Sequence, residues 1–299
     1  MPAAASQLEY SIVDVFTNAA LAGNPLAVVI DPIGLSTAQM QSIAREFNLS
    51  ETTFIERRPS SIEDAAGVRV RIFTTQEELP FAGHPTLGTA TVLKMDAPET
   101  VRDNTVTLAL NVGPIPVRFE EAGSFFGEMT QRDPEFGADL DPASVAHLTG
   151  LNLDDLDPAS PPQVVSTGTA FAIVALRSAE ALERLNVKQE EATAWLRDRG
   201  ARWFYVLAPT GKSQPAFRAR MQFNGGEDPA TGSAAGCAIA YLVARGAAPS
   251  GQRILLRQGV EINRPSDLFL SANKNSAKVT DVRVAGSTVL VAKGRLFLP

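Results

Sequence analysis

Short apolar stretches and alternating segments recur in the same order in both halves of the chain. Runs of apolar residues, and arginines that alternate with apolar residues, are typical of β-strands. The predicted strands cover residues 23–30, 52–55, 68–73, 168–175, 203–207 and 217–222. Each half contributes three of them at similar spacing, which indicates that one structural unit has been duplicated. Coincidental similarity of the two halves is the alternative.

An amphipathic helix is predicted between the first and second strands of each half. The first helix begins after Ser36, which forms a capping-box pattern with Gln39, and it ends at Asn48. The second covers residues 188–199, places its apolar side chains on one face and ends at Gly200.

A different kind of helix closes each half. Residues 88–93 and 232–243 are small or apolar around the whole circumference, and a helix of that kind is buried on all sides. Two similar motifs introduce these helices and align without a gap: His84-Pro-Thr-Leu-Gly-Thr-Ala and Asp228-Pro-Ala-Thr-Gly-Ser-Ala. We therefore expect a curled sheet around a central helix in each half.

These elements predict an α+β fold of two similar domains related by pseudo-twofold symmetry, each a curled sheet around a central apolar helix. The predicted N-terminal domain covers residues 1–124 and takes a C-terminal strand from about 289–299, because the tail alternates like paired strands. The predicted C-terminal domain covers residues 125–288.

Composition narrows the class of protein. Of the 299 residues, 44% are hydrophobic and 20% are charged, which excludes a disordered or collagen-like chain. A net charge of −6 without a long basic run argues against nucleic-acid binding. The first ten residues lack a secretory signal, and no apolar stretch approaches the ~20 residues of a membrane helix. We expect a cytoplasmic protein with no membrane partner.

Both aligned motifs place a titratable residue and a proline at the predicted start of a buried helix. The N–H groups and the positive dipole end of such a start suit a carboxylate. If the two starts face each other, His84 and Asp228 flank a small-molecule carboxylate substrate from opposite sides. The alternative is that both residues only cap their helices.

Glu51 is the third candidate, because it stands at the entry to an apolar strand. Desolvation can raise the pKa of such a carboxyl toward neutrality, which suits a group that takes up and returns a proton. The alternative is a solvated residue at the strand edge. A single cysteine, Cys237, leaves no cluster for zinc, and no dinucleotide-binding motif follows a strand, so we predict no metal and no cofactor.

The chain resembles the PhzF family, the phenazine-biosynthesis-like proteins of the diaminopimelate epimerase fold. The matching segments are Gly23-Asn-Pro-Leu-Ala-Val-Val, Asn48-Leu-Ser-Glu-Thr-Thr-Phe, Arg71-Ile-Phe-Thr, Leu79-Pro-Phe-Ala-Gly-His-Pro-Thr-Leu-Gly-Thr-Ala, Glu227-Asp-Pro-Ala-Thr-Gly-Ser-Ala and Glu261-Ile-Asn-Arg-Pro-Ser. The resemblance implies that each domain is a mixed, barrel-like sheet around its central helix, with the site in the cleft between the two domains. It also implies the isomerisation of a dihydro-hydroxyanthranilate by proton movement between ring carbons. It implies catalytic roles for Glu51, His84 and Asp228, and substrate-binding roles for Gly83, Gly232 and Ser233.

Epimerases of this fold use two thiols, one at the start of each central helix. Here Cys237 lies inside the second predicted helix, nine residues beyond Asp228, and we interpret it as a packing residue. The composition therefore excludes a two-thiol amino-acid racemase.

Two functions of different class remain open. The first is a cofactor-independent isomerase that moves a proton on a small cyclic or amino carboxylate, with Glu51 as acid and base. The second is a non-catalytic module that binds a metabolite or another protein with the same fold. The presence of Glu51 together with His84 and Asp228 favours the enzyme. A homodimer is expected from the frequency of twofold assemblies and from the resemblance.

Overall fold

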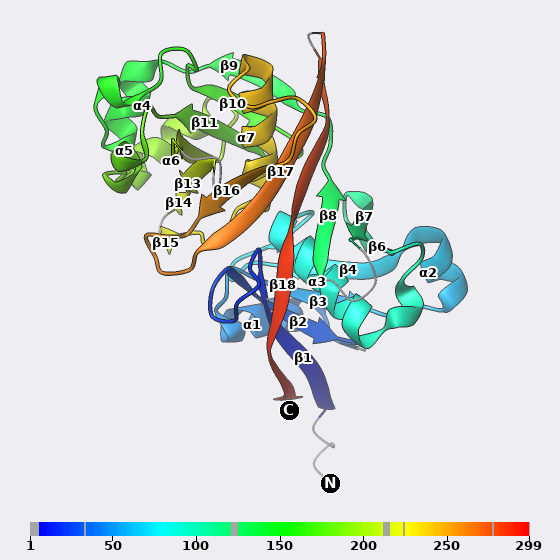
Figure 1. The fold of residues 1–299 in the computed structure, drawn as a ribbon. Coiled ribbons are helices and arrows are strands. Elements are labelled where there is room, and N and C mark those ends of the chain that lie inside the picture. Colours follow the sequence, from blue (N-terminus) through cyan, green and yellow to red (C-terminus); the bar gives the residue numbers. More distant parts are fainter. Residues whose placement is uncertain are drawn as a thin grey trace. The chain divides into compact units, whose positions relative to one another are not determined.

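The computed structural model describes residues 6–32, 34–120, 125–211, 216–223, 225–276 and 278–298. The chain divides into two compact units (Figure 1). Unit 1 comprises Met1–Met129 and Gly286–Pro299, and unit 2 comprises Thr130–Ala285. The domain boundary predicted at residue 124 falls within 121–124, which lie outside the described residues.

Unit 1 is a mixed sheet that closes on itself. In the order in which they are hydrogen-bonded, its strands are β1 (Ser6–Val15), β2 (Asn24–Ile30), β3 (Glu51–Glu56), β4 (Val68–Phe73), β6 (Thr105–Leu110), β7 (Gly113–Phe119), β8 (Phe126–Thr130) and β18 (Lys278–Leu298). Strand β18 also pairs with β1, from Thr288 onward, which completes the closed sheet. The short strand β5 (Glu78–Leu79) pairs with β4.

Unit 2 contains a sheet of the same design. Its strands follow the order β9 (Glu135–Asp139), β10 (Gln163–Ser166), β11 (Ala170–Ala175), β12 (Trp203–Pro209), β13 (Phe217–Arg220), β16 (Ile254–Gln258), β17 (Ser266–Asn275) and the N-terminal half of β18. A separate pair joins β14 (Gln222–Phe223) to β15 (Gly226–Glu227). Strand β18 thus begins in unit 2 and ends in unit 1 (Figure 1).

The two sheets share one pattern of strand directions. Starting from the β18–β1 pair in unit 1, the successive pairs are antiparallel, antiparallel, parallel, antiparallel, parallel, antiparallel and antiparallel. Starting from the β9–β10 pair, unit 2 repeats the same series. This agreement confirms the predicted α+β fold with two similar barrel-like units.

Helices connect the strands. They are α1 (Thr37–Phe47), α2 (Ser60–Ala66), α3 (Gly83–Asp96), α4 (Pro142–Thr149), α5 (Ala179–Glu183), α6 (Gln189–Arg197) and α7 (Gly232–Arg245), with 3₁₀ turns at Pro98–Thr100 and Leu153–Asp155. Helix α1 carries the predicted capping box of Ser36 and Gln39, and the left-handed Asn48 ends it. Among the described residues, no helix is both long and apolar enough to cross a membrane.

Helices α3 and α7 are the predicted central helices. Helix α3 is buried from Gly83 to Leu93 and contacts β1, β2, β3, β6 and β7 of its own unit. Helix α7 is buried through most of its length and contacts β10, β11 and β17 (Figure 1). Because both helices are apolar on every face, each can be covered only by a sheet that curls around it.

The helix starts correct the register of the predicted repeat. Gly83 begins α3 and Gly232 begins α7, a separation of 149 residues. The ion pairs Arg71–Glu78 and Arg220–Glu227 are displaced by the same 149 residues. The structural counterpart of His84 is therefore Ser233, and not Asp228 as the gapless alignment of the two motifs predicts. That alignment is wrong because it matches residue types, whereas strand pairing determines where each helix begins.

We predict that Gly236→Ala destabilises unit 2, because a Cβ at this point of α7 would overlap Oε1 of the buried Gln131. The Gln131 amide cannot turn away freely, since it donates to the Gly232 carbonyl at 2.9 Å and accepts from the Thr167 hydroxyl at 2.6 Å. Urea unfolding should show a loss of about 1–3 kcal/mol. In a Gln131→Ala background the same substitution should cost much less, and an equal cost in both backgrounds would contradict this packing.

Candidate active site

A cluster of three polar side chains lies at the N-terminal end of α3 in unit 1. Glu51 is the first residue of β3, and Asn24 is the first residue of the parallel neighbour β2. His84 is the second residue of α3, and its Nε2 lies 3.5 Å from Oε2 of Glu51. Its other ring nitrogen, Nδ1, lies 3.2 Å from Nδ2 of Asn24. Parallel pairing and the helix start therefore bring the predicted acid/base residue beside the predicted histidine.

Burial determines the charge of this histidine. His84 is 4% exposed, and burial lowers its pKa from 6.5 to about 3, against the opposing effect of a hydrogen bond with the Pro25 backbone. The imidazole is therefore neutral at physiological pH, with one nitrogen as donor and the other as acceptor. The side chain of Glu51 is 16% exposed, so a carboxylate that is largely buried still reaches the surface beside a neutral ring.

Asn24 is a member of the cluster that the sequence analysis did not single out. Its side chain is completely buried, and buried amides in proteins are held by hydrogen bonds. The available signal was a polar residue at the entry to the apolar stretch Leu26–Val29, directly after Gly23, whose φ is +68°. Burial and the contact with Nδ1 of His84 could not be deduced from that pattern.

The other predicted residues form a second group at the start of α7 in unit 2. Asp228 follows β15 and lies four residues before Gly232, the first residue of α7. Its Oδ2 accepts a 2.6 Å hydrogen bond from the hydroxyl of Thr231, and its backbone N–H donates to the Met221 carbonyl at 2.9 Å. Ser233, the second residue of α7, is partly exposed. The structure thus places Asp228, Gly232 and Ser233 in one unit, and Glu51, Gly83 and His84 in the other.

Neither His84 nor Asp228 caps its helix. The N-cap residues are Ala82 for α3 and Thr231 for α7, and neither side chain bonds to the first helical turn. His84 lies within the first turn, while Asp228 precedes the N-cap. Neither residue therefore occupies the N-cap position of its helix. The start of a helix leaves backbone N–H groups without intrahelical partners, and such groups suit an anion.

Cys237 is buried inside α7, and burial raises the pKa of its thiol to about 11. A neutral thiol packed in a helix fits the interpretation of a packing residue. Within the described ranges, no group of three or more His, Cys, Asp or Glu side chains could hold a metal ion.

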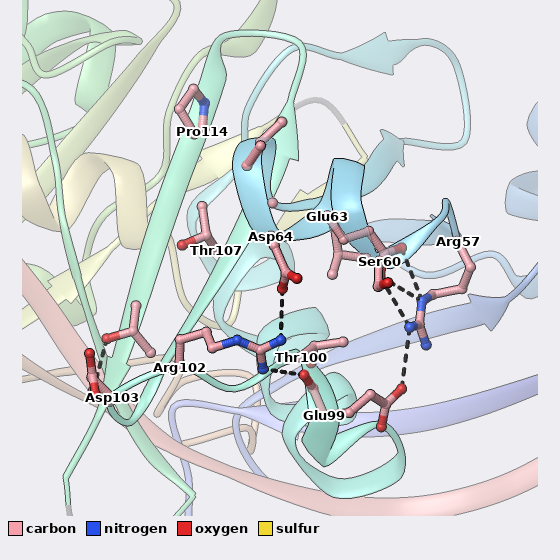
Figure 2. A pocket seen from close by; sticks show the side chains of 15 residues that line it. Arg57, Ser60, Glu63, Asp64, Glu99, Thr100, Arg102, Asp103, Thr107 and Pro114 are labelled. Carbon is pink, nitrogen blue, oxygen red and sulfur yellow. Dashed lines mark hydrogen bonds and ion pairs between the residues drawn. The ribbon is translucent and has the colours of Figure 1, made fainter.

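A cavity of about 490 Å³ lies elsewhere in unit 1, against α2 and the turn Pro98–Thr100 (Figure 2). Ion pairs of Arg57 with Glu63 and Glu99, and of Arg102 with Asp64, line this cavity. None of the predicted site residues is among its lining residues. Its two arginines are both held in ion pairs, so we assign it no chemistry.

The sequence and the fold are similar to those of proteins of one family. Residues 13–294 match the family described as phenazine biosynthesis-like protein. The trans-2,3-dihydro-3-hydroxyanthranilate isomerase of Pseudomonas aeruginosa is 37% identical over 294 residues, which cover 97% of this chain and 99% of that protein. An uncharacterized isomerase of Mesorhizobium japonicum is 34% identical over 97% of this chain and 98% of its own length.

Solved structures agree. A PhzF-family phenazine biosynthesis protein from Bacillus anthracis superimposes with a TM-score of 0.85 at 26% identity, covering 97% of this chain and 99% of that one. A hydroxyproline epimerase from Agrobacterium vitis shares the fold alone, with a TM-score of 0.63 at 12% identity over 98% of this chain and 93% of its own. The relatives named as isomerases support the prediction that this protein is an isomerase. The chain belongs to the phenazine biosynthesis-like (PhzF) protein family.

Proposed function

We propose that this protein is a cofactor-independent isomerase that moves a proton on a small cyclic or amino carboxylate, with Glu51 as the acid and base. The observation that carries the proposal is the pairing of Glu51 with the buried, neutral His84 across 3.5 Å. A structural ion pair would use a charged partner. A carboxylate beside a neutral imidazole keeps its capacity to take up a proton.

The proposed reaction needs no external oxidant or reductant. Glu51 removes a proton from one carbon, the electron pair shifts within the substrate, and the protonated Glu51 gives a proton to another carbon. Because the Glu51 side chain is partly exposed, its proton can exchange with solvent between these two steps. The composition of the substrate is unchanged, as an isomerisation requires. The first-turn N–H groups of a central helix would hold the substrate carboxylate and stabilise the negative charge that develops on it.

We further propose that Asp228, Gly232 and Ser233 act on the same substrate as Glu51, Gly83 and His84. Support comes from membership of the family and from the relative whose name gives a dihydro-hydroxyanthranilate as its substrate. That compound combines a ring, a carboxylate and an amino group. A helix start suits the carboxylate of such a substrate, and the Asp228 carboxylate suits its amino group.

We predict that Glu51→Gln abolishes proton transfer while the protein stays folded. In deuterium oxide with trans-2,3-dihydro-3-hydroxyanthranilate, the wild type should incorporate solvent deuterium into the product. The variant should do so about 10²- to 10⁴-fold more slowly, because an amide cannot act as the base. Mass spectrometry of the product measures both rates.

Glu56→Gln is the matched control, because Glu56 lies at the opposite end of β3 and is paired with Arg69 and Arg71. Its exchange rate should equal that of the wild type. Exchange by Glu51→Gln at the wild-type rate would remove Glu51 from the mechanism. If the wild type binds small carboxylates but exchanges no proton in any of them, the protein is the binding module instead.

We predict that His84 makes the folded state less stable as the pH falls. The unfolded chain takes up a proton at His84 below about pH 6.5, whereas the folded protein does so only near its pKa of about 3. Between pH 6 and pH 4 this residue should lower the free energy of unfolding by about 1.4 kcal/mol per pH unit. Urea unfolding of the wild type and His84→Gln should differ by that slope. An unchanged slope in His84→Gln would contradict a neutral His84.

A further inference from the structure

A buried polar network lies behind Asp228, and Gln258 is its centre. Gln258 is the last residue of β16 and is completely buried. Its Oε1 accepts from the Tyr205 hydroxyl at 2.9 Å and from the Thr231 backbone N–H at 3.1 Å. Its Nε2 donates to the Asp228 carbonyl at 2.8 Å and to the Thr231 hydroxyl at 3.0 Å. All four hydrogen-bonding positions of this amide are therefore used.

The backbone determines the direction of every hydrogen bond in this network. A backbone N–H can only donate and a carbonyl can only accept, so the orientation of the Gln258 amide is fixed by Thr231 and Asp228. Since Nε2 of Gln258 donates to the Thr231 hydroxyl, that hydroxyl keeps its one hydrogen for another acceptor. The acceptor is Oδ2 of Asp228, at 2.6 Å. The network thus ends in a hydrogen bond donated to the carboxylate.

We propose that Thr231 and Gln258 are positioning residues that hold the Asp228 carboxylate ionised and at a fixed place before the first turn of α7. A hydrogen bond donated to a carboxylate stabilises its charged form. The hydrogen bond that Gln258 donates to the Thr231 hydroxyl makes that hydroxyl donate toward Asp228. The hydrogen bond that Gln258 donates to the Asp228 carbonyl holds the backbone of Asp228 in place. The role in catalysis rests on the proposed function, in which Asp228 contacts the substrate.

Unit 1 shows that the fold does not need this network. When the two units are compared at the offset of 149 residues, Gly83 corresponds to Gly232. At the same offset, the counterparts of Asp228 and Thr231 are Leu79 and Ala82. Val68 of β4 pairs with Leu108 of β6, and its counterpart Phe217 of β13 pairs with Leu256 of β16. Two residues further along these strands, Leu110 is therefore the counterpart of Gln258. All three counterparts are apolar, so the same topology forms there without the polar groups.

Three other ionisable groups of unit 2 near this network are Tyr205, Cys237 and Arg220. Tyr205 of β12 is fully buried, and burial together with the charge of Asp228 raises the pKa of its phenol well above the usual value. Cys237 of α7 is a neutral thiol. Arg220 of β13 binds Glu227 of β15 through two nitrogens, at 3.0 and 2.6 Å, and also lies 3.9 Å from Glu261. Asp228 is therefore the group whose titration should report on Thr231.

The test is an NMR titration of the Asp228 side-chain carboxyl in the full chain, for the wild type, Thr231→Val and Thr231→Ser. Loss of the hydroxyl in Thr231→Val should move the titration midpoint up by about one pH unit. Thr231→Ser keeps the hydroxyl and should keep the wild-type midpoint. An unchanged midpoint in Thr231→Val, or an equal shift in both variants, would overturn the proposal.

Gln258→Leu copies the counterpart residue of unit 1 and provides a second variant if Thr231→Val fails to fold. Gln258→Leu should raise the titration midpoint of Asp228, as Thr231→Val does, because the freed Thr231 hydroxyl can turn away from Asp228. No shift in this variant would contradict the role of Gln258. With trans-2,3-dihydro-3-hydroxyanthranilate, both variants should lose about 10- to 100-fold in kcat/KM, and Thr231→Ser should retain it. The titration needs no substrate, so its result is independent of the exchange test of Glu51.

Discussion

The fold depends on burying two helices that have no polar face. A helix that is apolar all round must be enclosed, and in each unit a curled sheet encloses it, as α3 and α7 show. Enclosure leaves the N-terminal end as the place where backbone N–H groups remain without intrahelical partners. The proposed chemistry is concentrated there, because polar side chains can be placed at the rim of a curled sheet without opening its core.

Duplication supplied the same backbone twice, and the residues at the two rims then diverged. Phe54 is paired with Arg71 in unit 1, and Val206 is paired with Arg220 in unit 2. Because these two arginines form the matching ion pairs of the two units, Phe54 and Val206 occupy equivalent positions. Glu51 therefore corresponds to Trp203, and His84 corresponds to Ser233. In the proposed mechanism, unit 1 provides Glu51 beside His84, while unit 2 provides a carboxylate held by a buried amide network. One fold thus carries two different local chemistries, because few of its rim positions are needed for packing.

Features that follow from local sequence were predictable. The capping box of Ser36 and Gln39, the end of α1 at Asn48 and the burial of α7 each depend on residues close in the chain. The family resemblance named Glu51 and His84 as residues of one site, since strand entry and helix start are visible as motifs, and the structure brings these two residues together. The register between the two halves of the chain was not predictable, because proline, glycine and small residues match at more than one offset.

The supporting residues could not be found from the sequence for a related reason. Asn24 and Gln258 are ordinary polar residues at strand ends, and their importance arises from complete burial beside partners distant in the chain.

The neutrality of His84 connects the packing to the proposed chemistry. A protonated imidazole at 3.5 Å would attract the Glu51 carboxylate strongly in this poorly solvated place and would make it a weaker base. Burial against α3 and β2 prevents that protonation, so the ring can orient the carboxylate without neutralising its charge. In unit 2 the Thr231 hydroxyl donates a hydrogen bond to the Asp228 carboxylate. In the proposed mechanism the two carboxylates therefore have different roles, because Glu51 exchanges a proton while Asp228 remains an anion.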